Sequence, residues 1–336
     1  MFTTLYERPP LIVAEIGNNH EGRFEAAQKL VRAAADCGVD AVKFQVFRTE
    51  LYVSHVDPAR FQRLKSFELS FTQFEQLFSL ARSLNLKCIA TPLDLESAAF
   101  LESLVDSFKI ASGDNDFYPL IRYVAGTGKP MIVSTGVADT EHLTHLIDDV
   151  RDTWLQKGID GTGLLALLHC VTSYPVPPDQ VNLRAVSFLS QRFHLPIGYS
   201  DHTLGIEASL AAIALGAQII EKHFTLDKHT SDFRDHQLSA DPGEMKTLVT
   251  QSKLLAQMLG QPKKIIQPCE EPLIPVVRRS AVARRTLEAG QILGADDIVW
   301  VRPAGGIPSS DEDKLLRRRL KNKIAQGEPI TFSDLD

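Results

Sequence analysis

Long hydrophobic runs and an excess of positive charge are both missing from this 336-residue sequence. No segment approaches the roughly 20 apolar residues that a membrane span needs, and the N-terminal stretch MFTTLYERPP lacks the apolar core of a signal peptide. The formal net charge is −6, which argues against non-specific attraction to nucleic acid or to an acidic membrane. We therefore expect neither nucleic acid nor membrane among its partners.

Cysteine is also scarce. The sequence has four cysteines, and none of them shows the CxxC or metal-knuckle spacing of a zinc or redox site. Cys37, Cys88 and Cys170 fall in segments predicted to be helix or strand, where a thiol usually acts as a small apolar side chain. We expect reduced thiols and a cytoplasmic protein.

What the sequence does contain is a regular alternation of apolar strand and amphipathic helix. LIVAEIG at 11–17 has the composition of a buried strand, and the segment 25–38 behind it places apolar residues at helical spacing before a glycine stop. Seven more strand-like segments continue the pattern, at 40–47, 86–93, 107–112, 129–136, 164–171, 195–202 and 217–224.

Eight strand–helix units over about 250 residues predict an α/β fold, the (β/α)8 or TIM barrel. We place this barrel in residues 1–262. A doubly wound open sheet would show a similar alternation, but no GxGxxG motif follows the first strand.

The C-terminal part of the chain has a different organisation. QPKKIIQPCEEPLIPVV holds four prolines, which predicts a semi-rigid linker at 263–279. GQILGADDI (290–298) and GEPITFSDL (327–335) then align as a glycine turn, an apolar pair and an acidic turn. This repeat predicts a small, mostly β domain at 280–336. We interpret the basic segment RRRLKNK (317–323) as a solvated helix face.

Polar side chains stand at the carboxyl end of most predicted strands. In a barrel, alternate strand residues point inward and this end carries the active site. Lys43 and Gln45 share an inward phase on the second strand. Further polar residues at or just after strand ends are Glu15, Thr91, Ser112, Asp114, Thr172, Tyr174, Ser200, His202, Glu221 and His223. So many polar groups converging on one face indicate a single functional site.

Two histidines end adjacent predicted strands, in GYSDHT and EKHFT. His202 and His223 can therefore meet at one cation. Two imidazoles with oxygen donors suit manganese, iron, cobalt or zinc with open coordination positions. We interpret the pair as a Lewis-acid metal site.

Lys43 and Lys109 are the candidate cations for an anionic substrate, and Thr91, Ser112 and Ser200 add hydroxyl donors. A lysine among apolar neighbours is costly to bury unless it is paired. Lys109 and Ser112 cannot share a phase in a regular strand, so one of them lies past the strand end or at a bulge. An ordinary surface position for Lys109 is the alternative.

Two connections on the same face, 48–70 and 225–241, are long for barrel loops. We expect structureless loops, which at this length are usually functional or disordered. The second contains Asp232, Arg234, Asp235 and His236, a set suited to binding a polyol, with a solvated surface loop as the alternative.

The chain resembles the sialic acid synthase (NeuB) family, which condenses phosphoenolpyruvate with an N-acylated amino sugar. The matching segments are AEIGNNHEG, AVKFQ, ATPLD, FKIASGD, STG, HCVTSYP, GYSDHT and EKHFT, with WVRP in the last portion. The C-terminal segment resembles the family's antifreeze-like (SAF) domain, which in relatives caps the partner's barrel in a domain-swapped homodimer.

The resemblance implies a role for each matching residue. His202 and His223 would bind manganese, with magnesium or cobalt as alternatives, and Glu15 would be the acid nearest the reacting carbons. Residues implied to hold phosphoenolpyruvate are Lys43, Thr91, Lys109, Ser112, Thr172 and Ser200. Residues implied to contact the sugar are Gln45, Tyr174, Asp235 and, from the other subunit, Arg302.

The acceptor remains open between N-acetylmannosamine and a diacetamido-trideoxyhexose. Thr172, Asp114 and the segment FRDH at 233–236 all depart from the pattern of members that use N-acetylmannosamine. Two other classes of function compete with the synthase. One is a metal-dependent hydrolase on the same barrel, and the other is a non-catalytic carbohydrate- or ice-binding protein.

Overall fold

The chain forms two compact units, which divide between Gly260 and Gln261. The structure is a computed structural model that describes residues 9–336. The expectation that no signal peptide is present concerns mainly residues 1–8, which lie outside the described residues.

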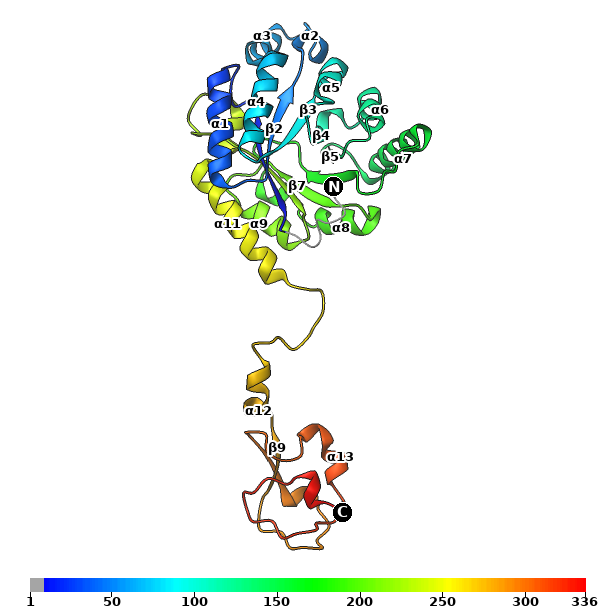
Figure 1. Cartoon of the computed structure of the whole chain (residues 1–336), viewed down its shortest axis with the longest axis vertical. Coiled ribbons are helices and arrows are strands. Elements are labelled where there is room, and N and C mark those ends of the chain that lie inside the picture. Colours follow the sequence, from blue (N-terminus) through cyan, green and yellow to red (C-terminus); the bar gives the residue numbers. More distant parts are fainter. Residues whose placement is uncertain (1–8) are drawn as a thin grey trace. The chain divides into compact units, whose positions relative to one another are not determined.

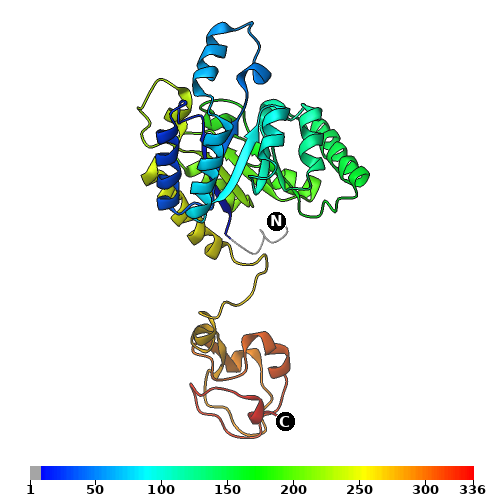
Figure 2. The ribbon, with the colours of Figure 1, turned by 45° about the horizontal axis from the view of Figure 1, so that its top comes forward.

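The first unit is a closed barrel of parallel strands in sequence order, which confirms the predicted fold (Figure 1; Figure 2). Its strands are β1 (Leu11–Gly17), β2 (Ala41–Val46), β3 (Lys87–Pro92), β4 (Ser107–Ile110), β5 (Met131–Ser134), β6 (Leu165–Cys170), β7 (Ile197–Asp201) and β8 (Ile219–His223). β1 pairs with both β2 and β8, so the barrel has no open edge.

Helices cover the outside of the barrel. They are α1 (Phe24–Cys37), α4 (Phe71–Ser83), α5 (Leu95–Leu101), α6 (Tyr118–Gly126), α7 (Thr140–Lys157), α8 (Ala185–Phe193), α9 (Glu207–Ala214) and α11 (Pro242–Leu259). Some of the helices begin at a capping side chain, as α7 does where the carboxylate of Asp139 accepts the N–H of His142 at 2.8 Å. No helix within residues 9–336 has the length and apolarity that crossing a membrane would require.

The strands separate two apolar regions. Outward residues pack on the helices, as Phe44 does edge-on against Phe74 and Phe78 of α4 with ring centroids 5.9 and 5.8 Å away. Inward residues near the amino ends of the strands form a second cluster inside the barrel, made of Leu11, Val13, Ala41, Ile89, Ile132, Ala166, Leu168 and Ile219. Further along the same strands the inward phase becomes polar.

The two long connections contain short helices, so the expectation of structureless loops is wrong. They hold α2 (Thr49–Tyr52), α3 (Pro58–Phe67) and α10 (Arg234–Leu238). Asp57 and Pro58 start α3, with the Asp57 carboxylate accepting the N–H of Arg60 at 3.0 Å. Phe67 then packs edge-on against Phe233, just before α10, at 5.2 Å.

The second unit contains α12 (Ile274–Val277), β9 (Ser280–Ala283), β10 (Ile298–Val301) and α13 (Glu312–Leu315). β9 and β10 form an antiparallel pair, and isolated bridges connect much of the remainder. A separate apolar core fills it, composed of Ala281, Ala283, Leu287, Leu293, Ile298, Ile307, Leu315, Leu320, Ile324, Ile330 and Leu335.

The predicted repeat is visible in this unit. Asp297 accepts the N–H of Gly294 at 3.0 Å, and in the second copy Asp334 accepts the N–H of Thr331 at 2.8 Å. The helical interpretation of 317–323 is wrong, because this segment follows α13 in extended bridges and buries Leu320. Its alternation of one apolar residue among basic ones fits an extended edge as well as a helix face.

Candidate active site

The polar inward residues meet at the carboxyl end of the barrel. Strand register places Glu15 beside Lys43, Gln45 beside Thr91, and Ser200 beside Glu221. Four of them continue the inward phase of an apolar residue two positions earlier, as Glu15 follows Val13; the four are Glu15, Lys43, Thr91 and Glu221. One half of the barrel interior is therefore apolar and the other half is charged.

Lys43 is the centre of this cluster and is 4% exposed. Its Nζ lies 3.3 Å from Oε1 of Glu15, 3.1 Å from Oε2 of Glu221 and 3.3 Å from Oγ1 of Thr91. Glu221 also accepts a hydrogen bond from Ser200 Oγ at 2.9 Å. Burial by itself would lower the pKa of Lys43, but the two carboxylates raise it above its ordinary value. The ammonium therefore stays charged inside the barrel.

The two glutamates of this cluster differ in protonation. Burial tends to raise the pKa of Glu221, but Lys109, Lys43 and the Ser200 hydroxyl outweigh it and hold the pKa at about 2. Burial raises the pKa of Glu15 more than Lys43 lowers it, and the charge of Glu221 raises it further. Glu221 is thus a fixed anion, whereas Glu15 exchanges a proton more easily.

Lys109 lies in the same interior and is 2% exposed, so the alternative of a surface lysine is wrong. Its Nζ donates to Ser134 Oγ at 2.5 Å and to the carbonyl of Ile110 at 3.1 Å. Burial lowers its pKa to about 8. Ser112 lies past the end of β4, in the turn that follows the strand, which resolves the phase problem noted above.

A group of hydroxyls borders Gly136, next to Lys109. The Gly136 N–H donates to Ser112 Oγ at 3.2 Å. A β-carbon at Gly136 would collide with the hydroxyls of both Ser112 and Thr172, so a glycine is required there. Thr172 is itself solvent-exposed, unlike the other hydroxyl-bearing residues predicted for the site.

The two histidines face each other across the ends of β7 and β8, with ring centroids 5.4 Å apart. His202 Nδ1 lies 3.1 Å from the carbonyl of Val171, which leaves its Nε2 for another partner. Tyr174 lies 4.2 Å from the His202 ring, and the guanidinium of Arg234 lies 4.6 Å from the Tyr174 ring.

Asp235, on α10, approaches the histidine pair. Its Oδ2 lies 4.0 Å from His223 Nδ1. Buried His223 Nδ1, Asp235 Oδ1 and Glu15 Oε2 find no hydrogen-bond partner among the described residues. Burial lowers the pKa of His223 well below its ordinary value, so its imidazole is neutral. Unsatisfied buried groups of this kind are typical of ligand sites.

The donor set fits a divalent metal. Each imidazole keeps a nitrogen without a hydrogen-bond partner among the described residues, and the Asp235 carboxylate lies nearby, so the pair is a suitable ligand set for manganese, cobalt or zinc. Within residues 9–336, no three His, Cys, Asp or Glu side chains converge into a complete metal centre. The ion would therefore keep open positions for water or substrate oxygens.

Arg302 lies in the second unit, exposed, just after β10. Its Nε donates to the carbonyl of Val277 at 2.6 Å. Gln45, by contrast, belongs to the barrel site, where its Nε2 donates to Glu15 Oε1 at 3.1 Å and its Oε1 accepts from Asn18 at 3.0 Å.

Two residues of the site were missed by sequence reasoning. Ser134 shares the inward phase of Ile132 on β5, so the alternation rule applied to the other strands would have found it. Cys170, interpreted above as an ordinary apolar thiol, lies inside the barrel 3.5 Å from Ser112 Oγ and 3.8 Å from His202 Nδ1. Spacing alone did not distinguish it from the other buried cysteines.

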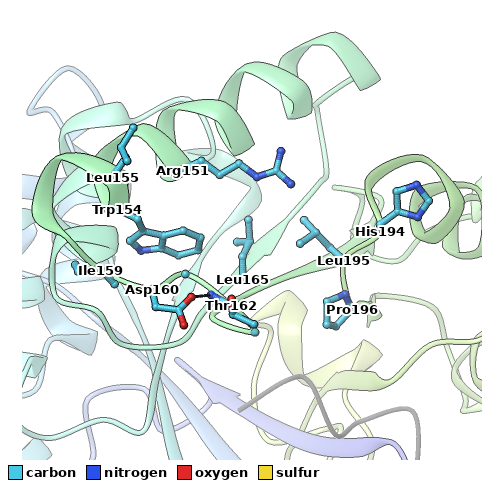
Figure 3. A pocket seen from close by; sticks show the side chains of 12 residues that line it. Arg151, Trp154, Leu155, Ile159, Asp160, Thr162, Leu165, His194, Leu195 and Pro196 are labelled. Atoms are coloured by element: carbon cyan, nitrogen blue, oxygen red, sulfur yellow. Dashed lines mark hydrogen bonds between the residues drawn. The ribbon is translucent and has the colours of Figure 1, made fainter.

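A cavity of about 630 Å³ lies away from this chemistry, where β6 begins and the chain enters β7 (Figure 3). Its wall includes the ring of Trp154, whose Nε1 donates to the carbonyl of Ala125 at 3.1 Å. Leu165, Leu195 and Pro196 also line it. The cavity contains none of the lysines, glutamates or histidine pair, so the charged cluster is the candidate active site.

The chain is similar to known proteins over nearly its whole length. The sequence model of the NeuB family matches residues 30–264, and that of the SAF domain matches 278–336. An uncharacterized protein of Methanocaldococcus jannaschii is 42% identical over 97% of this chain and 95% of its own length. The N,N'-diacetyllegionaminic acid synthase of Legionella pneumophila is 37% identical over 97% of this chain and 94% of its own length.

A solved structure is similar as well. It is the N-acetylneuraminic acid synthetase of Leptospira borgpetersenii in complex with citrate, with a TM-score of 0.74 and 33% identity. The match covers 80% of this chain and 90% of that one.

Proposed function

The chain belongs to the NeuB family, and on that premise we propose that it is a nonulosonic acid synthase. It condenses phosphoenolpyruvate with the open-chain aldehyde of an N-acylated amino sugar and releases phosphate. The observation that carries the proposal is the buried cluster of Lys43 and Lys109 with hydroxyl donors, beside two facing imidazoles.

Phosphoenolpyruvate carries a carboxylate and a phosphate, and the site offers a lysine for each. We assign Lys43, with Thr91 and Ser200, to one anionic group. We assign Lys109 to the other, together with its partner Ser134 and with Ser112 and Thr172 around Gly136. Both lysines are held by neighbours before substrate arrives, so little reorganisation is required on binding. Positioning of this kind contributes up to about 7–11 kcal/mol to a bimolecular reaction.

We assign the metal ligands to His202 and His223. A divalent ion, which we propose to be manganese, would polarise the aldehyde oxygen of the acceptor when bound. The chain's own contribution is to keep the His223 imidazole neutral by burial and to orient His202 through the Val171 carbonyl.

The bond changes balance without a redox partner. The methylene carbon of phosphoenolpyruvate bonds to the aldehyde carbon, and the aldehyde oxygen takes up a proton to become a hydroxyl. Water adds its oxygen to the former enol carbon and gives up a proton, which Glu15 is placed to accept through its unpartnered Oε2. The carbon–oxygen bond to phosphate then breaks, the added oxygen becomes the keto oxygen, and its proton leaves with the phosphate.

The sugar is assigned to the outer side of the site. Tyr174 and Asp235 lie next to the histidines there, Arg234 stacks on Tyr174, and Gln45 contributes from its position next to Glu15. A diacetamido-trideoxyhexose is the favoured acceptor, because the 37% identity to a diacetyllegionaminic acid synthase extends over 97% of the chain. N-acetylmannosamine is the competing acceptor, supported by the 33% identity to the N-acetylneuraminic acid synthetase.

The test is phosphate release from phosphoenolpyruvate with manganese and each acceptor in turn. Release with the diacetamido sugar and not with N-acetylmannosamine supports the favoured acceptor, and the reverse result replaces it. Release without any acceptor would identify a hydrolase, and retention of sugar without turnover would identify a binding protein. In ¹⁸O-labelled water, the label should enter the keto acid and not the phosphate.

We further propose a cytoplasmic homodimer in which residues 1–262 form the catalytic barrel and residues 280–336, after the linker 263–279, cap the barrel of the other copy. Free thiols at all four cysteines support a reducing compartment. Arg302 is exposed on its own unit and would complete the partner's sugar site.

Mixing two inactive variants tests this arrangement. Arg302→Ala and His202→Ala proteins, denatured and refolded together, should regain about a quarter of the wild-type rate, because half of the dimers are mixed and each has one intact site. If the mixture shows only the activity of the separate variants, Arg302 acts within its own chain or not at all.

A further inference from the structure

Asp201 and Lys222 form a buried ion pair on the outer face of the barrel, behind the histidines. They are neighbours in the β7–β8 register, and both side chains are 0% exposed. Lys222 Nζ lies 3.4 Å from Asp201 Oδ2. Because successive strand residues point to opposite faces, they point toward α9 while His202 and His223, the next residues, belong to the inner face.

The pair also holds the residue after His202. Asp201 Oδ1 accepts from the N–H of Thr203 at 2.8 Å and from its hydroxyl at 2.7 Å. Lys222 Nζ donates to the Thr203 carbonyl at 2.5 Å. Ser209 of α9 adds a hydrogen bond to Asp201 Oδ2 at 2.6 Å. His202 is therefore fixed on both sides, by Asp201 before it and by Thr203 after it.

Stability alone does not account for this arrangement. A fully buried ion pair regains little more than the cost of its desolvation, and apolar residues of similar volume often stabilise a fold as well. The outer faces of the other strands are mostly apolar where they meet the helices, as at Phe44, and the polar exception, His169 on β6, has an uncharged partner, the Val181 carbonyl. The charged pair occurs immediately next to the two proposed metal ligands.

We propose that Asp201 and Lys222 are positioning residues that hold the two imidazoles at metal-binding separation. The inference rests on the proposed function, in which His202 and His223 bind the ion. A single ion held by a nitrogen of each ring would tolerate only small changes in the 5.4 Å spacing of the rings. Lys222 connects β8 to Thr203, so the pair ties the strand that carries one histidine to the backbone that carries the other.

The experiment measures Mn²⁺ binding to the full chain without substrates, by the loss of the free-ion electron paramagnetic resonance signal. Asp201→Asn and Lys222→Met should each weaken Mn²⁺ binding by about 10–100-fold, the range found for residues that orient metal ligands. Both variants should turn over more slowly than the wild type at low Mn²⁺, and saturating Mn²⁺ should restore much of the lost rate.

Two further variants separate positioning from folding. The double variant Asp201→Leu with Lys222→Met leaves no unpaired charge, so it should melt near the wild-type temperature and still bind Mn²⁺ weakly. Asp94→Asn is the matched control, because Asp94 is also buried and accepts hydrogen bonds from Arg48 N, Ser97 N and Ser97 Oγ. It should lower the melting temperature without changing Mn²⁺ affinity.

Wild-type Mn²⁺ affinity in a folded double variant would overturn the positioning role, even if both single variants melt early. A wild-type protein that binds no Mn²⁺ and releases no phosphate would instead overturn the proposed function, on which the positioning role depends.

Discussion

The two halves of the barrel interior are built from the same strands in the same phase, yet they carry opposite chemistry. Near the amino ends the inward residues are apolar, among them Leu168, Ile132 and Ile219. Near the carboxyl ends they include Lys43 and Glu221, with charge buried almost completely. The first half stabilises the barrel by excluding water. The second half contains charged groups whose burial costs free energy, and these groups have a purpose only if they bind a charged substrate or an ion.

This contrast predicts that substitutions in the two halves separate activity from stability. The strongest effect should come from the histidines. His202→Ala or His223→Ala should lower turnover on the order of 10³-fold, comparable to loss of a group that stabilises developing charge. The melting temperature should change little. Turnover of either variant near the wild-type rate would contradict the metal assignment.

Lys43→Met should have the next largest effect. It removes the ammonium at similar volume, so kcat/KM for phosphoenolpyruvate should fall about 10²-fold while KM for the sugar changes little. Lys129 is a matched control from the opposite end, where it precedes β5 and its Nζ donates to the Val105 carbonyl at 2.9 Å. Lys129→Met should leave kcat/KM unchanged. If the Lys43 variant were impaired equally toward phosphoenolpyruvate and the sugar, Lys43 would have no specific role in binding phosphoenolpyruvate.

The lowered pKa of Lys109 predicts a smaller, pH-dependent effect. Burial brings this pKa to about 8, with Glu221, Lys43, Cys170 and Glu15 as its charged or titratable neighbours. The ammonium is present below this pKa and is lost above it. Therefore kcat/KM for phosphoenolpyruvate should fall about tenfold per pH unit above pH about 8. Lys109→Arg keeps its charge, so its profile should stay flat there. An identical fall in the variant would assign the pKa to another group.

Leu168→Ala, in the apolar half, should have the smallest effect on catalysis and a large one on folding. Leu168 is fully buried, so its truncation should lower the free energy of unfolding by about 2–5 kcal/mol. Denaturant titration measures this loss, and kcat/KM of the folded protein should equal the wild-type value. A parallel loss of kcat/KM would show that the two halves are mechanically coupled.

Particular residues show how much of the fold and of the candidate site can be predicted from the sequence. Alternation along the strands was enough to predict the eight strands and the inward phase of Lys43, Gln45, His202 and His223, because that phase depends only on local geometry. The same alternation rule would also have predicted that Ser134 points inward. Within 48–70, Asp57 and Pro58 form a helix-start signal for α3, but the length of this connection alone suggested a loop.

The sequence by itself determined the order of strands and helices, the apolar and polar phases, and the family. Only the tertiary structure decided which charges meet. Lys43 pairs with Glu15 and also with Glu221, which lies 178 positions further along the chain, because the barrel closes β8 onto β1. The same closure sets the protonation of the two glutamates, since a pKa depends on neighbours and burial and not on sequence position. It also decided that 317–323 is extended, because bridges to distant segments outweigh local helical preference.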